Sequence, residues 1–488
     1  MFYPQLSTLK KYAKEFNRIP IYKELDISNL DLLSLLKALQ FSETLIFLES
    51  AKENKKWSRF SFFGLKAQKI ISFYGTHIEI EKNGKKEIVK EDFFEYLKKE
   101  LKKYNSPIYR SFGDFNGGYV GYLGFEMVNY CKILRRNIKE NKNIPLASLS
   151  LIDDFIVYDN KKDKYFLATC IYTDKDLNNE YISKCSYLIE KEREIIKLLK
   201  KTTIPFLPQK PQKIHLNYST PKEEFLRKVM ETKRMIAEGE AIQVVLSIRA
   251  SIEDEIDPYR FYLKLRSLNP SPYMFFLKFK DIYIVGSSPE IHVKVEKNKV
   301  YLKPIAGTIK QGRNKKENLI NKQKLLKDPK ENAEHLMLVD LARNDLGRIA
   351  KTGTVKVEKF MRPEDYSHVI HLVSLVTCEI SEDKHMIDII RETFPAGTVS
   401  GAPKVRAIEI IDELEPHPRD IYAGAIGYFG FNQCLDTCIT IRTAVFSPTM
   451  QYLQAGAGIV YDSIPEKEFE EINNKLMALS VSLGYAKK

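Results

Sequence analysis

Asp328-Pro-Lys-Glu331-Asn-Ala-Glu334-His335 is the stretch from which the fold and its chemistry can best be worked out. Proline is favoured in the first turn of a helix, so Pro329 predicts a helix that begins here and continues through the mainly apolar residues that follow. Residues three apart lie on the same helical face, which places the carboxylates of Glu331 and Glu334 side by side. We therefore expect a helix with an acidic patch near its N-terminus.

A second acidic pair lies near the other end of the chain, in Pro465-Glu-Lys-Glu-Phe-Glu-Glu-Ile-Asn-Asn-Lys475. Glu468 and Glu471 repeat the same spacing, again after a proline. Two such acidic faces could share a hard cation. Mg²⁺ suits them, because it binds through one or two carboxylates and keeps positions open for substrate oxygens. From spacing alone, the commoner explanation is that the helix dipole favours acids in the first turn.

Two glycine-rich segments add possible ligand-binding backbone. Phe394-Pro-Ala-Gly-Thr-Val-Ser-Gly-Ala-Pro-Lys404 offers backbone donors, hydroxyls and a lysine without bulky side chains, which suits a bound carboxylate or phosphate. Ala455-Gly-Ala-Gly-Ile-Val460 is typical of a strand whose glycines allow a ligand to approach closely. Neither segment is a dinucleotide fingerprint, and no Walker sequence occurs.

Composition excludes several classes of protein. The chain has 488 residues, 44% of them apolar, but no continuous apolar run long enough to span a membrane and no secretory signal. Its formal charge of +13 raises nucleic-acid binding, yet the lysines are interleaved with acids, as in Lys98–Lys103 and Lys191–Lys201, which is typical of solvated helix faces. The six cysteines include no CxxC pair and are expected to be reduced. We expect a cytoplasmic protein that binds neither membrane nor nucleic acid.

One proline-rich interruption divides the chain. It predicts a linker at 204–217 between an N-terminal region, 1–203, and a C-terminal portion, 218–488. Periodicity predicts helices over Asp92–Tyr104, Tyr181–Lys201 and Pro221–Glu238, and strands over Thr76–Glu81, Phe155–Tyr158 and Ile242–Ala250. Strands of mixed spacing with several long helices, and no regular alternation, predict an α+β protein.

Taken in order, these segments resemble the chorismate-utilising enzymes, most closely the anthranilate synthase component I family. The other matching segments are Phe47-Leu-Glu-Ser50, Asn116-Gly-Gly-Tyr-Val-Gly-Tyr122, Gln243-Val-Val-Leu-Ser247, Asn269-Pro-Ser-Pro-Tyr-Met274, Gly286-Ser-Ser-Pro-Glu290 and Pro304-Ile-Ala-Gly-Thr308. The matches are densest from about residue 218 onward, which the resemblance identifies as the catalytic portion. The resemblance implies a large sandwich of antiparallel sheets flanked by helices, with the active site in a cleft.

The resemblance also implies a site for chorismate, which carries two carboxylates and a hydroxyl on ring carbon 4. Glu334 and Glu471 match the ligands that hold Mg²⁺ against the ring carboxylate, with Glu331 and Glu468 as supports. Glu290 matches an acid that assists loss of the hydroxyl, a role that needs a protonated carboxyl with a raised pKa in a shielded site. The positions that match substrate-binding residues are Thr398, Tyr422, Arg442, Gly456, Gly458 and Lys475.

His371, in Ser367-His-Val-Ile-His-Leu-Val-Ser374, matches the family histidine linked to the elimination that releases pyruvate. Taken alone, a histidine in an apolar strand is more often a hydrogen-bonded core residue. The matching context favours a catalytic role, either in moving a proton or in orienting the enolpyruvyl group. The same resemblance assigns Thr308 and Gln243 to the catalytic site.

Two positions discriminate between branches of the family that use different nucleophiles. Aminodeoxychorismate synthases typically have a lysine that adds to the ring, where this chain has Ala306. Isochorismate and salicylate synthases typically have a water-activating lysine where this chain has Gln243, whose amide does not titrate. The resemblance therefore implies attack by ammonia on ring carbon 2 and loss of pyruvate to give anthranilate, the first step of tryptophan biosynthesis. An aminodeoxychorismate synthase of the kind that lacks the lysine is the alternative.

Ammonia needs a source, and no cysteine lies in the glycine-rich nucleophile elbow expected of a glutaminase. The resemblance implies a separate glutamine amidotransferase subunit, component II, and hence a hetero-oligomer. From a different class, the competing hypothesis is a catalytically silent scaffold of the same fold. The presence of Glu334, Glu471 and Arg442 disfavours it.

Two further segments match the family's tryptophan-binding elements, through Glu49, Ser50, Pro272, Tyr273 and Met274. Glu49 could pair with an ammonium group, and the Pro-Tyr-Met surface could pack on an indole ring. Seen singly, these segments are more simply explained as an apolar strand and a turn. Their joint presence favours feedback inhibition by tryptophan.

Overall fold

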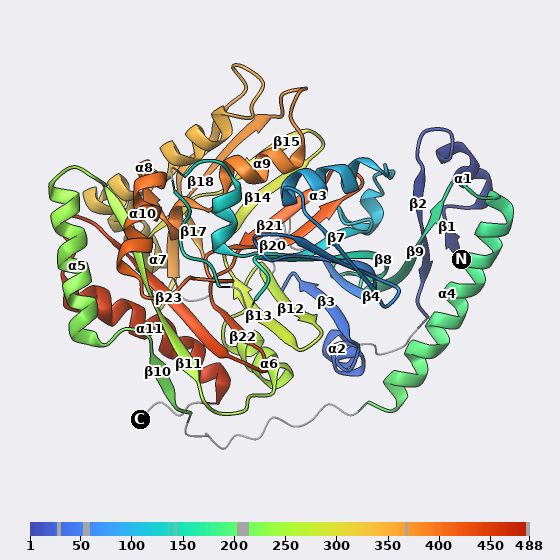
Figure 1. The fold of residues 1–488 in the computed structure, drawn as a ribbon, viewed down its shortest axis with the longest axis horizontal. Helices are drawn as coiled ribbons and strands as arrows, with labels where there is room; N and C mark the ends of the chain where they lie inside the picture. The colour runs from blue at the N-terminus through green and yellow to red at the C-terminus, as the bar shows by residue number, and fades with distance from the viewer. Residues whose placement is uncertain are drawn as a thin grey trace.

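The computed structural model of the chain describes residues 1–26, 31–51, 59–134, 136–141, 144–202, 214–366 and 369–484. Its strands pair in antiparallel fashion into one continuous network, which divides into two arms at the long central pair β4 (Phe60–Phe73) and β8 (Ala147–Asp159). The arms are the layers of a sandwich flanked by helices (Figure 1). The α+β class and the sandwich of antiparallel sheets are therefore confirmed.

The first arm continues outward from β4. In order of pairing it contains β3 (Thr44–Glu49), β12 (Tyr273–Phe279), β13 (Ile282–Ser288), β22 (Thr443–Phe446), β23 (Gln451–Ile459) and β11 (Gln243–Ile252), with β10 (Leu216–Tyr218) and β19 (Gly401–Ala402) beyond β11. The second arm leaves the other edge of β8. It contains β7 (Gly118–Leu123), β20 (Ala425–Gly430), β21 (Leu435–Ile439), β14 (Ile291–Glu296), β15 (Lys299–Leu302) and β18 (Val369–Glu379), which pairs with both β16 (Ile305–Lys310) and β17 (Lys356–Asp365).

Strands from the N-terminal region complete the network. They are β9 (Lys164–Tyr172) beside β8, then β2 (Arg18–Glu24) and β1 (Phe2–Tyr3), and the hairpin β5 (Ile78–Lys82) and β6 (Lys85–Val89) beside β4. Because β3 pairs with β12 and β7 pairs with β20, the N-terminal region and the C-terminal portion build the same sheets. Residues 203–213, most of the predicted linker at 204–217, lie outside the described residues, so the domain boundary stays a prediction.

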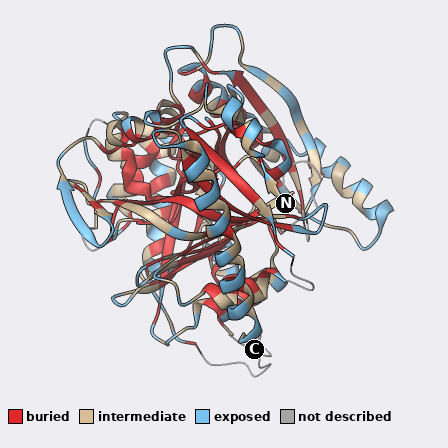
Figure 2. Ribbon diagram, turned by 90° about the vertical axis from the view of Figure 1, so that its right-hand side faces the viewer, coloured by how far each residue is buried: buried red, intermediate tan, exposed pale blue. Residues whose placement is uncertain are grey.

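Helices cover the outer faces of the sheets. They are α1 (Leu6–Tyr12), α2 (Leu32–Leu39), α3 (Phe93–Lys102), α4 (Leu177–Lys200), α5 (Lys222–Ala237), α6 (Pro258–Leu268), α7 (Lys315–Lys327), α8 (Pro329–Gly347), α9 (Met386–Thr393), α10 (Lys404–Leu414) and α11 (Pro465–Leu483), with 3-10 turns η1 (Arg110–Phe112), η2 (Phe125–Tyr130) and η3 (Gly397–Val399). In Figure 1, α4 borders one end of the molecule, and α5 and α11 border the other. Figure 2 shows the result, with strands mostly buried and helices exposed on their outer sides.

The predicted helices are present, and their caps explain where they begin. Asp92 caps α3 by accepting a hydrogen bond from the N–H of Glu95 at 3.0 Å. The helix predicted from Tyr181 begins earlier, at Leu177, because Asp176 accepts from the N–H of Asn179 at 2.8 Å and provides a cap that periodicity alone does not show. All six cysteines are free thiols. Nowhere in the described part of the chain is a helix long and apolar enough to cross a membrane.

Candidate active site

The two acidic pairs predicted from the sequence lie in the first two turns of α8 and α11. Asp328 caps α8 by accepting hydrogen bonds from the N–H groups of Lys330 and Glu331 at 3.0 and 3.2 Å, and Pro329 occupies the first turn. Pro465 begins α11 in the same way. The predicted helix starts are therefore confirmed.

The acidic patches of the two helices interact. Burial is the largest cause that raises the pKa of Glu331, Glu334 and Glu468, and repulsion from neighbouring carboxylates adds to it, with Glu471 acting on all three. Carboxylates shift one another's pKa in this way only when they lie close together. We therefore identify the two patches as one acidic site formed between α8 and α11.

A divalent cation fits this acidic site. Two lysines offset only part of the negative charge of the four glutamates. Lys475 pairs with Glu471 at 2.7 Å, and Lys330 approaches Glu334 to 3.9 Å. Within the described residues, no three His, Cys, Asp or Glu side chains are grouped so that they could hold a metal by themselves. Mg²⁺ does not need such a cage, because it commonly binds one or two carboxylates and completes its shell with water and substrate oxygens. The site suits a cation shared between protein and ligand.

The Pro304–Thr308 segment lies against α8. The ladder between β16 and β18 shifts register between Ala306 and Thr308, where Gly307 has a φ of 70°, a conformation that favours glycine. The N–H of Thr308 donates to Oε2 of Glu331 at 3.1 Å. A Cβ on Gly307 would lie 3.1 Å from the same oxygen. Glu331 is thus held by backbone, which suits the supporting position predicted for it.

His371 lies on β18 beside this bulge. Its Nδ1 is 3.1 Å from the carbonyl oxygen of Gly307 and 3.0 Å from Oγ1 of Thr308. A carbonyl oxygen can only accept, so Nδ1 carries the proton of the neutral imidazole and Nε2 carries the lone pair. The structure therefore brings His371 and Thr308 together, as the sequence predicted. Ser367 and His368 lie outside the described residues.

Glu290 is a buried carboxyl just before β14. Burial raises its pKa to about 8, against opposing effects of the Thr398 hydroxyl and the Arg442 guanidinium. The Thr398 hydroxyl is itself buried and makes no hydrogen bond of normal geometry. Glu290 is therefore largely protonated at neutral pH, as its predicted role as an acid requires.

Arg442 is a cation that the buried Glu290 affects electrostatically but does not pair with. Its guanidinium donates one hydrogen bond, 3.5 Å long, to Oδ1 of Asn269, and it forms no ion pair with a carboxylate in the described part of the chain. Burial lowers the pKa of the guanidinium. Withdrawing an unpaired charge from water is costly, and a planar guanidinium matches a carboxylate with two parallel hydrogen bonds. The position suits an incoming carboxylate.

A glycine strand brings five more predicted residues together. Gly456 and Gly458 lie on β23, paired with β11. A Cβ on Gly456 would lie 2.8 Å from the hydroxyl of Tyr422, and a Cβ on Gly458 would lie 2.6 Å from Nε2 of Gln243. The carbonyl oxygen of Gly456 accepts a hydrogen bond from Nζ of Lys475 at 2.7 Å. The absence of side chains at both glycines is therefore what lets these polar groups approach the strand.

Sequence reasoning missed two residues of this site. The ring of Tyr366 packs edge-on against His371, with 4.9 Å between ring centroids, and its hydroxyl interacts electrostatically with Glu290 and Arg442. Asn269 is the hydrogen-bond acceptor for Arg442. Asn269 begins the matching segment Asn269–Met274 and Tyr366 directly precedes the segment Ser367–Ser374, but neither residue type carries a signal of its own.

The five residues predicted to bind tryptophan line one cavity of about 420 Å³. Glu49 on β3 lies opposite Met274 on β12, and Ser50, Pro272 and Tyr273 are their neighbours in the chain. The lining of this cavity shares no residue with that of the cavity beside Glu290. Glu290 and Thr398, the predicted active-site residues that line the smaller cavity, therefore lie apart from the cavity of the predicted tryptophan site.

Glu49 already has partners inside the protein. Its carboxylate accepts hydrogen bonds from the hydroxyl of Tyr262 and from Nε of Arg266 at 2.8 and 2.9 Å, and Nη2 of Arg266 lies 2.7 Å away. An ammonium group at Glu49 would share the carboxylate with this arginine.

The chain is similar to known proteins over almost its whole length. The family described as chorismate binding enzyme matches residues 48–480. Anthranilate synthase component 1 of Acetivibrio thermocellus is 41% identical over 483 residues, covering 98% of each chain, and that of Aquifex aeolicus (strain VF5) is 41% identical over 494 residues, covering 99% of this chain and 98% of the relative.

Solved structures show the same fold. Anthranilate synthase component I from Streptococcus pneumoniae TIGR4 is 33% identical with a TM-score of 0.74, over 87% of this chain and 92% of that one. The menaquinone-specific isochorismate synthase from Escherichia coli, at 20% identity and a TM-score of 0.69 over 98% of both chains, is alike in fold alone. The buried acid, the unpaired arginine and this full-length similarity lead to one conclusion: the chain belongs to the chorismate-binding enzymes, in the anthranilate synthase component 1 family.

Proposed function

We propose that the chain converts chorismate and ammonia into anthranilate, pyruvate and water, with Mg²⁺ as cofactor and tryptophan as feedback inhibitor. The observation that carries this proposal is that a guanidinium that forms no ion pair in the described part of the chain, Arg442, acts electrostatically on a buried acid whose pKa is about 8, Glu290. A substrate that offers both a carboxylate and a leaving hydroxyl satisfies both groups at once.

Binding of the substrate carboxylates follows from the groups around the site. Arg442 receives one carboxylate through its planar guanidinium. The hydroxyls of Thr398 and Tyr422 and the ammonium of Lys475 complete the polar surroundings. Of these, the Thr398 hydroxyl is buried and interacts with Glu290, but without a hydrogen bond of normal geometry. A ligand oxygen at that position would give it a better hydrogen-bond partner.

The acidic site between α8 and α11 would otherwise repel a dianionic substrate. Glu334 and Glu471 would hold Mg²⁺, with Glu331 and Glu468 as supports. When bound, the cation would neutralise the ring carboxylate and let a nucleophile approach ring carbon 2. The raised pKa values of Glu331, Glu334 and Glu468 support this assignment, because these acids gain most from a nearby positive charge.

Glu290 supplies the proton for the first half of the reaction. Ammonia forms a bond to ring carbon 2, the ring double bonds shift, and the hydroxyl on carbon 4 leaves with the proton of Glu290 as water. A carboxyl with a pKa of about 8 still holds that proton at neutral pH. Its burial also keeps bulk water away from the leaving group.

His371 acts in the second half. Its Nδ1–H is fixed by Gly307 and Thr308, so Nε2 is the nitrogen that can take the proton from ring carbon 2. Loss of that proton expels enolpyruvate, which is protonated to pyruvate, and leaves the aromatic ring of anthranilate. The edge-on contact with Tyr366 restricts the orientation of the imidazole.

Ammonia is favoured as the nucleophile because the chain has no amine where other branches of the family have one. Ala306 on β16 presents only a methyl group, and the amide of Gln243 packs against β23 and does not titrate. The relatives carry the name component 1, which suits our proposal that a separate glutamine amidotransferase subunit supplies the ammonia in the cytoplasm.

Tryptophan would act from the cavity at Glu49, Ser50 and Pro272–Met274. The segment that begins at Asn269 connects this cavity to the active site, since Asn269 accepts from the Arg442 guanidinium and its carbonyl accepts from the hydroxyl of Ser287 at 2.5 Å. A ligand that moves Pro272–Met274 would displace a contact of the substrate-binding arginine. This link supports feedback inhibition by a coupling between the two cavities.

With chorismate, Mg²⁺ and ammonium chloride, the isolated chain is expected to form anthranilate, and it should use glutamine only after a component II subunit is added. Fluorescence and mass detection of the product check this. Accumulation of 4-amino-4-deoxychorismate would instead identify the aminodeoxychorismate branch.

Activity is expected to depend on the proton of Glu290. Because its pKa is raised to about 8, the carboxyl is protonated below that pH, so kcat/KM for chorismate at constant free ammonia should fall as the pH rises through about 8. Glu290→Gln should lower kcat about 100-fold or more and remove that limb of the profile. Its melting temperature should be unchanged, because the amide is neutral like the native acid. An alkaline limb that persists in this variant would show that another group is titrating.

Glu334→Gln and Glu471→Gln are expected to raise the Mg²⁺ concentration for half-maximal activity by about tenfold or more, because each removes one anionic ligand. Glu466→Gln, an exposed acid in the first turn of α11, is the matched control and should behave like wild type. Magnesium titrations of activity, together with thermal melting, check this. Wild-type magnesium dependence in the first two variants would mean that these acids are ordinary helix-turn residues.

Ser50→Phe is expected to fill the regulatory cavity and relieve inhibition by tryptophan, with little change in activity when tryptophan is absent. In wild type, tryptophan and a chorismate analogue should weaken each other's binding by the same factor. Ser267→Phe, at an exposed serine on α6, is the control. Calorimetry decides the matter: equally tight tryptophan binding to wild type and Ser50→Phe, or no binding to wild type, contradicts the assignment.

A further inference from the structure

A turn between α10 and β20 carries Tyr422 to the active site. Two of its residues, Asp420 and Ala423, have φ angles of 56° and 62°, values that residues other than glycine rarely adopt. The carbonyl oxygen of Asp420 accepts a hydrogen bond from the N–H of Phe125 in η2 at 2.7 Å. The turn therefore has a conformation that its own residues do not favour, and contacts with other parts of the chain hold it.

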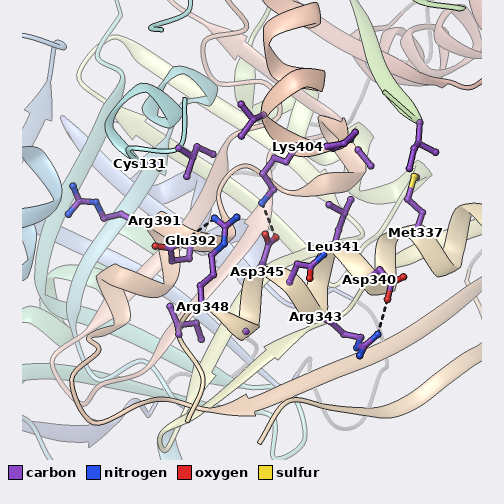
Figure 3. Close-up of a pocket in the computed structure, with 18 of the residues that line it drawn as sticks. Cys131, Met337, Asp340, Leu341, Arg343, Asp345, Arg348, Arg391, Glu392 and Lys404 are labelled. Atoms are coloured by element: carbon purple, nitrogen blue, oxygen red, sulfur yellow. Dashed lines mark hydrogen bonds and ion pairs between the residues drawn. The ribbon is translucent and has the colours of Figure 1, made fainter. Parts of the chain in front are cut away.

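Thr398, the other hydroxyl proposed to bind the substrate, also lies outside the strands, in the short turn η3. Helix α10 ties this segment to α8, since Nζ of Lys404 pairs with Asp345 at 2.8 Å (Figure 3). On its inner side, the carbonyl oxygen of Ser400 accepts from the N–H of Val245 on β11 at 2.9 Å. The segment is thus held between a helix and a strand.

One edge of β11 lacks a neighbouring strand over part of its length in the described part of the chain. β19 pairs with the first two residues of β11 and β10 with its last three. Between them, the carbonyl oxygen of Val245 accepts from Nη2 of Arg419 at 2.6 Å, and the N–H of Ser247 donates to Oε1 of Glu415 at 2.8 Å. Buried backbone groups need partners, so these two side chains occupy the place of a strand.

Arg419 and Glu415 form a buried ion pair at this edge. Nε and Nη2 of Arg419 donate to the two carboxylate oxygens at 2.9 and 2.6 Å, and both side chains are almost fully buried. Such a two-point pair fixes the plane of the guanidinium as well as its position. The remaining groups of the guanidinium are therefore aimed in fixed directions.

These directions lead to both loops of the active site. Nη1 of Arg419 donates to the carbonyl oxygen of Val399, the residue after Thr398, at 2.7 Å. The guanidinium also lies over the ring of Tyr422, with 5.7 Å from its carbon to the ring centroid. One planar group thus contacts β11, η3 and the turn that carries Tyr422.

We propose that Arg419 is a positioning residue for chorismate, which sets the places of the Thr398 and Tyr422 hydroxyls relative to each other and to β11. This inference rests on the proposed function, because it concerns the binding of the same substrate. The two hydroxyls lie in separate loops, and a substrate with two carboxylates needs them at a fixed separation. The guanidinium supplies the common reference point without touching the substrate.

The test is a double-mutant cycle on kcat/KM for chorismate, in the full chain with Mg²⁺ and ammonium chloride. Arg419→Lys keeps a charge beside Glu415, but a single ammonium cannot reproduce the planar set of hydrogen bonds. It should lower kcat/KM about tenfold or more. In a Thr398→Ala or a Tyr422→Phe background it should lower kcat/KM about threefold or less, because one of the hydroxyls that it positions is then absent.

Arg18→Lys is the matched control. Arg18 is also fully buried, pairs with Asp153 at 2.6 Å, donates to the carbonyl oxygen of Asn116 at 2.9 Å and lies over the ring of Phe431, but it contacts no residue proposed to bind substrate. This variant should lose thermal stability as Arg419→Lys does. Its kcat/KM for chorismate should match that of the corresponding parent in all three backgrounds.

A second variant decides the question if Arg419→Lys does not fold. Combining Arg419→Gln with Glu415→Gln removes both charges together, so that neither is left buried alone, and still breaks the hydrogen bonds to Val245 and Val399. It should give the same loss of kcat/KM and the same dependence on background. An equal loss in all backgrounds, or no loss, overturns the positioning role and leaves the proposed function intact. Absence of anthranilate from wild type with ammonium overturns the proposed function itself.

Discussion

The structure depends on charges that its own side chains leave incompletely compensated. Arg442 forms no ion pair in the described part of the chain, Glu290 keeps its proton because it is buried, and the glutamates of α8 and α11 repel one another. Each arrangement costs stability when the protein is alone. A ligand with two carboxylates and a bound divalent cation would relieve these costs together. The free energy that the uncompensated charges cost the unliganded protein would then contribute to the affinity for the ligand and the cation.

The fold holds these charges in place by drawing on distant parts of the chain. α8 and α11 supply the four glutamates, the segments just before β14 and β22 supply Glu290 and Arg442, and β18 supplies His371. The bulge at Gly307 fixes both Glu331 and His371 through backbone groups. One local distortion therefore positions a residue of the acidic site and the histidine proposed to take the proton. Rigid strands and a backbone anchor are suited to a site whose like charges would otherwise move apart.

Much of this could be predicted from the sequence, for identifiable reasons. The helix starts at Pro329 and Pro465 follow from the preference of proline for the first turn of a helix. The family resemblance predicted that the glutamates of the two helices lie together. Asn269 and Tyr366 could not be found, because their roles arise from tertiary contacts with Arg442 and His371. The pairing of Glu49 with Arg266 is likewise invisible in the sequence, since the two residues are far apart along the chain.

The most direct test of the central claim is calorimetric binding of a non-reacting chorismate analogue to the full chain at increasing Mg²⁺ concentrations. If the carboxylates of the ligand and the acids of α8 and α11 share one cation, the analogue should bind tighter as Mg²⁺ increases. Mg²⁺ should in turn bind tighter by the same factor when the analogue is present. An affinity for the analogue that does not change with Mg²⁺ would contradict the account.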